Sequence, residues 1–153
     1  MKLKHLARIA LLSAITISPL SFANSDPLVG KWKTIDDRTG YSLSDIVISK
    51  VQDGSYTATI VDIRAVPGAT TLTNCQKCTG ELKNKPLLGF TPLKNLKMNS
   101  TNKTEFSGGK YIDPRTGHEY QTKARLSNNG KHLIIRNTSP TVTTGRNITW
   151  VKY

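Results

Sequence analysis

The segment Ser107–Leu126 predicts a β-hairpin, and it constrains the possible fold more than any other stretch of the chain. Asp113-Pro114 starts the turn, because proline sets φ at the first central position and the aspartate carboxylate accepts backbone N–H groups. Gly117 then supplies the positive φ that returns the chain. Beyond the turn, residues 120–126 alternate between uncharged side chains and charged or amide side chains. This alternation is typical of a strand with one buried face and one solvent face.

The rest of the chain repeats this pattern of short strands and tight turns. Gly108-Gly109, inside the first strand of the hairpin, predicts a bulge or a sharp bend of the kind found at the corner of a small barrel. Further strands are expected at residues 30–35, 43–51, 56–64, unevenly over 87–98 with an interruption at Pro92, and at 131–136 and 145–152. No amphipathic helix of useful length and no internal repeat is found. We therefore expect an all-β chain, a single antiparallel meander of about eight strands closed into a small barrel, because closure removes exposed sheet edges.

The first 23 residues predict a signal peptide. A short cationic stretch precedes the apolar core Ile9–Ile17, and residues 21–23 end in the small-x-small pattern that a signal peptidase recognises. We expect cleavage after Ala23, which leaves residues 24–153 as one barrel domain in the periplasm or outside the cell. No cysteine stands at the cleavage point, and no later apolar run is long enough to span a membrane.

The chain is strongly basic, with 22 Lys and Arg against 10 Asp and Glu. Removing residues 1–23 lowers the cations to 19 and leaves the acids at 10, so the exported chain keeps a formal charge of +9. This charge favours an anionic envelope component as partner, whereas a nucleic acid is not expected in that compartment. The alternative is that lysine and arginine are scattered over outward strand faces for solubility.

A long connection, residues 65–85, interrupts the strand pattern and contains Cys75 and Cys78. A loop of roughly twenty residues is usually either functional or held in place by a crosslink. In an oxidising compartment the Cys-x-x-Cys spacing favours a local disulfide, which contributes only about 2 kcal/mol because the closed loop is short. Two alternatives stay open: a thiol redox site, without a helix to activate its first cysteine, and a metal site, for which only His118 and His132 remain and neither has ligand spacing. We expect no metal and no cofactor.

Several motifs, taken in order, resemble one bacterial family. They are Gly30-x-Trp32; Cys75-x-x-Cys78-x-Gly80 leading to Lys85-Pro86-Leu87-Leu88-Gly89; the hairpin motif from Gly108 to Lys123; Leu133-x-x-Arg136; and Gly145-Arg146-x-x-x-Trp150. This set resembles the exported family called domain of unknown function 2147 (DUF2147), which implies a lipocalin-like barrel and an envelope location but no established activity. The chain departs from the family at residues 137–144, which are polar where an apolar turn is usual.

The resemblance also implies how the barrel closes. In lipocalin-like barrels an arginine of the last strand covers a tryptophan near the start, so Arg146 is expected over the indole of Trp32 as a structural cation–π contact. Trp150 lies four residues after Arg146 and is expected on the same face of an unbulged strand, in the core.

The function expected from these features is non-enzymatic binding of a small or elongated apolar ligand, or of an envelope component, by a monomer. No catalytic residues are assigned, because the aspartates lie in or near turns and no Gly-x-Ser-x-Gly motif occurs. The residues expected to line the ligand site are Trp32, Tyr56, Ile60, Tyr111, Tyr120 and Trp150. The alternatives are a basic protein that interacts with the envelope surface, and a thiol redox or metal-handling protein that uses the loop containing Cys75 and Cys78.

Overall fold

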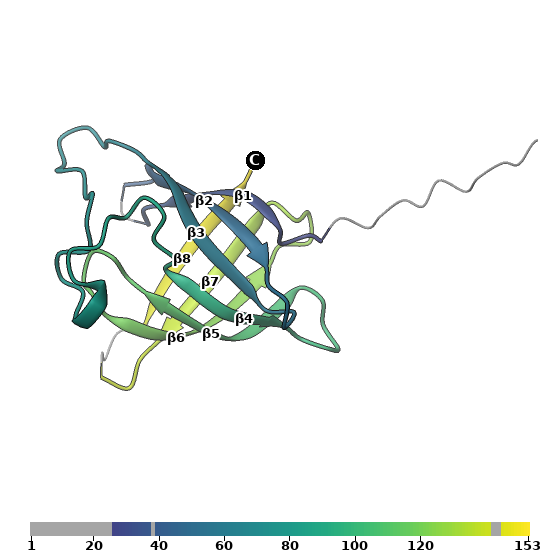
Figure 1. The fold of residues 1–153 in the computed structure, drawn as a ribbon. Coiled ribbons are helices and arrows are strands. Elements are labelled where there is room, and N and C mark those ends of the chain that lie inside the picture. Colours follow the sequence, from purple (N-terminus) through teal and green to yellow (C-terminus); the bar gives the residue numbers. More distant parts are fainter. Residues whose placement is uncertain (1–25, 38, 142–144) are drawn as a thin grey trace, which may run out of the picture.

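Eight antiparallel strands close into a barrel in the computed structural model, which describes residues 26–37, 39–141 and 145–153 (Figure 1). The strands are β1 (Gly30–Ile35), β2 (Ser42–Lys50), β3 (Tyr56–Ile63), β4 (Leu93–Met98), β5 (Glu105–Ile112), β6 (Glu119–Leu126), β7 (His132–Thr138) and β8 (Arg146–Lys152). Each strand pairs with the next one in sequence, and β8 pairs with β1. The only helical element among the described residues is a 3-10 turn, η1 (Gly80–Leu82). The predicted all-β barrel is confirmed, whereas the predicted signal peptide, residues 1–23, lies outside the described residues.

The predicted hairpin is formed by β5 and β6. The Asp113 carboxylate accepts the backbone N–H of Arg115 at 2.9 Å, and Gly117 has φ +73°, as the turn chemistry requires. Burial alternates strictly along β6, with every second side chain inside the barrel. Gly108 has φ +73°, and the register between β5 and β6 shifts between Phe106 and Gly109, so the predicted bulge is confirmed.

One end of the barrel, which we call the closed end, is filled by side chains. It contains Leu28, Trp32, Ile48, Tyr56, Leu96, Phe106, Leu126 and Leu133, each exposed by 4% or less. The rings of Tyr56 and Phe106 pack edge to face with their centroids 5.8 Å apart. Trp32 Nε1 donates to the carbonyl of Leu28 at 2.9 Å, and the Tyr56 hydroxyl donates to Asp26 Oδ2 at 2.8 Å. The residues before β1 therefore cap this end.

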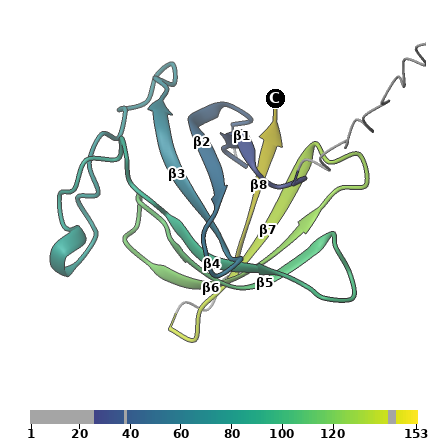
Figure 2. The same ribbon diagram turned by 45° about the vertical axis from the view of Figure 1, so that its right-hand side comes forward.

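At the opposite, open end, strands β1, β3, β5 and β7 end and strands β2, β4, β6 and β8 begin; this end also carries the long connection 64–92 between β3 and β4. Figure 2 shows this connection, with η1 at its far edge, standing beside the barrel at the end where β3 stops. The prediction that strand structure resumes at Leu87 is wrong, because β4 begins only at Leu93. Gly89, with φ +83°, turns the chain so that its N–H reaches the carbonyl of Ile60, and Pro92 has no N–H to donate.

Candidate functional site

A cavity of about 550 Å³ occupies the open end of the barrel. Its apolar inner residues come from strands on both sides of the barrel and include Ile46, Ile60, Ile148 and Trp150, each exposed by 8% or less. These positions face inward because alternate residues of a strand point to the same side. The volume lies within the range of small-molecule sites, about 300–1,000 Å³. The barrel interior is thus packed at one end and hollow at the other.

Charged groups surround the mouth of this cavity in compensating pairs. Arg146 Nη1 lies 2.6 Å from Asp113 Oδ2, and the Asp113 side chain is only 4% exposed. A second pair lies at the mouth, where Arg115 Nη1 is 3.4 Å from Asp36 Oδ2. Arg64 also lines the cavity, and its Nη2 lies 2.6 Å from Oδ1 of Asp45, which is outside the lining. Because each of these guanidinium groups faces a carboxylate, the three arginines do not form an uncompensated positive site.

Tyr111 lines the same cavity from β5, with its side chain directed inside the barrel between Gly109 and Asp113. Burial, together with the nearby negative charge of Asp113, raises the pKa of the Tyr111 hydroxyl above its ordinary value, so this hydroxyl keeps its proton. It makes no hydrogen bond to any residue that the structure describes. The Tyr111 hydroxyl is therefore free to donate to an oxygen of a bound molecule.

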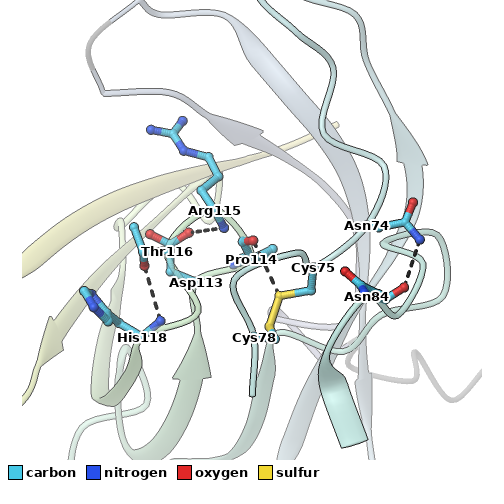
Figure 3. Close-up of a disulfide and its surroundings, with 9 residues drawn as sticks. All are labelled: Asn74, Cys75, Cys78, Asn84, Asp113, Pro114, Arg115, Thr116 and His118. Atoms are coloured by element: carbon cyan, nitrogen blue, oxygen red, sulfur yellow. Dashed lines mark hydrogen bonds between the residues drawn. A yellow bond between two sulfur atoms is a disulfide. The ribbon is translucent and has the colours of Figure 1, made fainter. Parts of the chain in front are cut away.

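The long connection forms one wall of the cavity. Residues 69–72 and Lys77 line it, and Cys75 and Cys78 are joined by a disulfide, which confirms that prediction. Figure 3 shows the disulfide against the β5–β6 turn, where Cys75 Sγ contacts the carbonyl oxygen of Pro114 at 3.5 Å.

The loop that carries the disulfide is closed by its own backbone. The N–H of Cys75 donates to the carbonyl of Lys85, and the N–H of Asn84 donates to the carbonyl of Cys75, both at 2.9 Å. Cys75 and Cys78 are exposed by 0% and 4%. This burial argues against the thiol-exchange alternative, which requires an accessible sulfur.

The six residues that were predicted to bind ligand lie at three different places in the barrel. Ile60, Tyr111 and Trp150 line the main cavity, and Tyr120 lines a second hollow of about 360 Å³ bounded by β4, β5, β6 and residues 139–141. Trp32 and Tyr56 are wholly buried at the closed end and line neither hollow, which corrects their assignment. Their alternation in the strand did place them inside the barrel, but the sequence pattern does not show at which depth a barrel is filled.

The predicted cover of Trp32 by Arg146 is wrong. Trp32 pairs in register with Lys152, whose Nζ lies 5.3 Å from the centroid of the indole and donates to the carbonyl of Pro27 at 2.7 Å. Arg146 begins the same strand, six residues away, and a strand rises by about 3.3 Å per residue. Arg146 therefore belongs to the open end, where it pairs with Asp113.

Several groups at the cavity mouth were not identified from the sequence. Asp36 and Asp113 were interpreted only as turn residues, and Arg64 and Arg115 were not singled out. The position of the two carboxylates could have been predicted. Asp36 follows β1 and Asp113 follows β5, and these strands run to the same end of an up-and-down barrel. The pairing of each arginine depends on contacts between segments far apart in sequence.

Residues 26–37, 39–141 and 145–153 bring together no group of three histidine, cysteine, aspartate or glutamate side chains that could hold a metal ion. The same part of the chain contains no helix with the length and apolar character needed to cross a membrane.

Comparisons with known proteins agree with this architecture. The model of the family described as "Uncharacterized protein conserved in bacteria (DUF2147)" matches residues 30–152. Protein HP1028 from the human pathogen Helicobacter pylori, whose solved structure is described as belonging to the lipocalin family, is similar over 82% of each chain, with a TM-score of 0.64 and 20% sequence identity. At that identity the likeness concerns the fold. No curated protein matches this chain. The predicted family resemblance and lipocalin-like barrel are confirmed.

Proposed function

The chain belongs to the bacterial protein family DUF2147, and from its barrel we propose that the protein is a non-enzymatic binding protein that holds a small or elongated ligand in the cavity at the open end. The observation that carries this proposal is the asymmetry of the barrel interior. An eight-stranded barrel can be filled completely by its own side chains. Here the closed end is filled in that way, whereas the open end keeps a cavity of about 550 Å³ with apolar inner walls.

The chemistry of the cavity supports a ligand that is apolar over most of its length and uncharged at its polar end. The inner part of the cavity offers Ile46, Ile60 and Trp150, which favour an apolar group. At the mouth, Arg64, Arg115 and Arg146 are each paired with a carboxylate, so a ligand carboxylate would have to displace one. Lys77, the remaining cation among the described residues that line the cavity, is exposed. The unpartnered Tyr111 hydroxyl instead suits a hydroxyl or ester oxygen.

We propose further that this binding takes place outside the cytoplasm, after removal of residues 1–23. The disulfide between Cys75 and Cys78 supports this location, because disulfides persist in oxidising compartments such as the periplasm.

A matched pair of cavity variants tests the proposal. Ile60 points into the cavity, and its neighbour Val61 on the same strand is 39% exposed to solvent. We expect the neutral probe N-phenyl-1-naphthylamine to bind the unmodified protein with a rise in fluorescence. Ile60→Trp should weaken this binding at least tenfold by filling the cavity, while Val61→Trp should leave it within about threefold. Equal binding by both variants, or no binding by the unmodified protein together with no co-purifying molecule in mass spectrometry, would contradict the proposal.

The polarity of the ligand is tested by competition with the same probe. Dodecanol and dodecanoate have apolar chains of the same length and differ at the polar end, which is a neutral hydroxyl in one and a charged carboxylate in the other. We expect dodecanol to displace the probe at lower concentration, because the arginines at the mouth already have carboxylate partners. Stronger displacement by dodecanoate would refute the inference that the ligand has an uncharged polar end. The proposed binding function would still stand.

A further inference from the structure

The outer surface of β4–β7 gathers positive charge on one flank of the barrel, which we call the basic face. Its outward side chains include six exposed cations, Lys94, Lys97, Lys110, Lys123, Arg125 and Arg136, against two exposed acids, Glu105 and Glu119. The cations are therefore concentrated on neighbouring strands rather than scattered evenly over the barrel. Concentration on one side produces a local positive potential that scattered charges do not produce.

The strand register places cations of this face directly opposite one another. Lys94 on β4 lies opposite Lys110 on β5, and Lys123 on β6 lies opposite Arg136 on β7. Like charges in directly opposed positions destabilise a sheet, so this arrangement does not serve the stability of the barrel. None of these four residues forms an ion pair with any residue that the structure describes.

The other flank shows a different arrangement. Lys33 on β1 lies opposite Asp45 on β2, which in turn lies opposite Asp62 on β3. Lys33 and Asp45 carry opposite charges, and Asp45, although it also faces the acidic Asp62, is paired with Arg64 at 2.6 Å. The facing charges of this flank therefore have compensating neighbours, as in an ordinary solvated surface. The difference between the two flanks points to a partner that supplies the missing negative charge on the basic face.

We propose that the basic face docks on the surface of an anionic phospholipid membrane. Neighbouring strands lie about 4.8 Å apart and alternate residues about 6.8 Å apart, so the fixed cations form a dense two-dimensional array. Lipid phosphates diffuse within the bilayer and gather beneath such an array, and juxtamembrane lysine and arginine residues bind anionic leaflets in this way.

Two features of the face favour a membrane over a soluble polyanion. Ile134 on β7 is 41% exposed and lies opposite Arg125, so an apolar side chain stands among the cations, as in interfacial segments. The outward positions of β4–β7, all of which are described, include no phenylalanine, tyrosine or tryptophan on which a nucleic-acid base could stack. Charge and apolar exposure thus coincide on one surface.

Charge-reversal variants with equal net charge test this assignment. The face variant carries Lys110→Glu, Lys123→Glu and Arg136→Glu, and the control carries Lys31→Glu, Lys83→Glu and Lys85→Glu, three exposed positions off the basic face. We expect the unmodified protein to sediment with phosphatidylglycerol vesicles at low salt, less so at high salt, and not with phosphatidylcholine vesicles. The face variant should lose affinity by on the order of a hundredfold, and the control should stay within about threefold.

Each remaining outcome bears on the proposal. Equal losses in the two variants would show that net charge alone governs binding and would overturn it. Binding to soluble heparin or dextran sulfate without binding to vesicles would replace the membrane by a soluble polyanion. Thermal unfolding of both variants shows whether the barrel is intact, and the substituted side chains point outward, so folding is expected to persist. Vesicle binding does not depend on cavity occupancy, so this test is independent of the ligand-binding proposal.

Discussion

Gly117 and Lys77 approach each other so closely that a β-carbon on Gly117 would lie 2.0 Å from the carbonyl oxygen of Lys77. Gly117 belongs to the β5–β6 turn, and Lys77 lies between the two cysteines of the disulfide loop. Figure 3 shows the disulfide beside residues 113–116 of this turn. The two segments are separated by 40 positions in the chain, and both contribute residues to the cavity wall. This backbone contact therefore sets the position of the long connection over the open end.

Gly117→Ala should destabilise the protein far more than an ordinary glycine substitution. The new β-carbon would collide with backbone that cannot move away, so we expect a loss of about 3 kcal/mol or more in the free energy of unfolding. Gly130→Ala is the matched control, because Gly130 has nearly the same φ, +69° against +73°, and nothing within 4 Å of an added β-carbon. It should lose only about 1 kcal/mol. Urea unfolding of both variants checks this, and equal losses would refute the importance of the contact with Lys77.

Arg146→Met should be costly because it leaves the Asp113 carboxylate buried without its partner. The Asp113 side chain is 4% exposed, whereas that of Arg146 is 24% exposed, so we expect a loss of about 2 kcal/mol, below the range for a fully buried pair. Arg125→Met, at an exposed position of β6, should change stability by less than about 0.5 kcal/mol. Thermal unfolding of the two variants measures the difference. Similar melting temperatures for Arg146→Met and Arg125→Met would contradict the pairing.

Because of Asp26, the free energy of unfolding of the barrel should depend on pH in the acid range. Burial acts to raise the pKa of this carboxyl, but hydrogen bonds from the Tyr56 hydroxyl, the Leu28 N–H and Lys50 outweigh it and hold the pKa below 3.8. A carboxyl with a lowered pKa in the folded state stabilises the protein fully above its ordinary pKa, and this contribution is lost as pH falls through the lowered pKa.

The Asp26→Asn variant isolates that contribution. Urea unfolding between about pH 6 and pH 3 should show the free energy of unfolding of the unmodified protein falling at the acid end more steeply than that of Asp26→Asn. The variant should also be less stable at neutral pH, since Asp26 caps the closed end through Tyr56. Parallel pH profiles would argue against the lowered pKa.

Removal of the disulfide should loosen the cavity wall without unfolding the barrel. The ring closed by Cys75 and Cys78 is short, so the Cys75→Ala and Cys78→Ala double variant should lose at most about 2 kcal/mol. Hydrogen exchange should accelerate at the backbone amides of positions 75 and 84, which close the loop, and stay unchanged at the closed end. Unchanged exchange at these two amides would show that the loop is held without the disulfide.

The hairpin formed by β5 and β6 could be predicted because its determinants are local. Asp113, Pro114 and Gly117 specify a turn through their own backbone preferences, and the alternation after it specifies which face is buried. The cover of Trp32 could not be predicted in the same way. Lys152 rather than Arg146 lies over this ring because of the register between β1 and β8, which joins the two ends of the barrel. The motif Gly145-Arg146-x-x-x-Trp150 describes β8 alone and does not specify how β8 is aligned with β1.

The candidate site could likewise be predicted only in part. Ile60, Tyr111 and Trp150 could be placed inside the barrel by alternation alone, but so could Trp32 and Tyr56, which lie at the filled end. Depth along the barrel depends on the lengths of all eight strands and on the segments that cap each end. Residues 26–29, which precede β1, cap one end, and the long connection stands at the other.

The amino-acid sequence by itself determined the all-β class, the strand–turn order and the inward face of each strand, and it favoured the disulfide, because these follow from backbone preferences and from spacing within short segments. Only the tertiary structure decided which end of the barrel is hollow, which carboxylate each arginine meets and that the outward cations share one flank. These features arise from register and closure, which join residues far apart in the chain, and local sequence carries no information about the partner across such a distance.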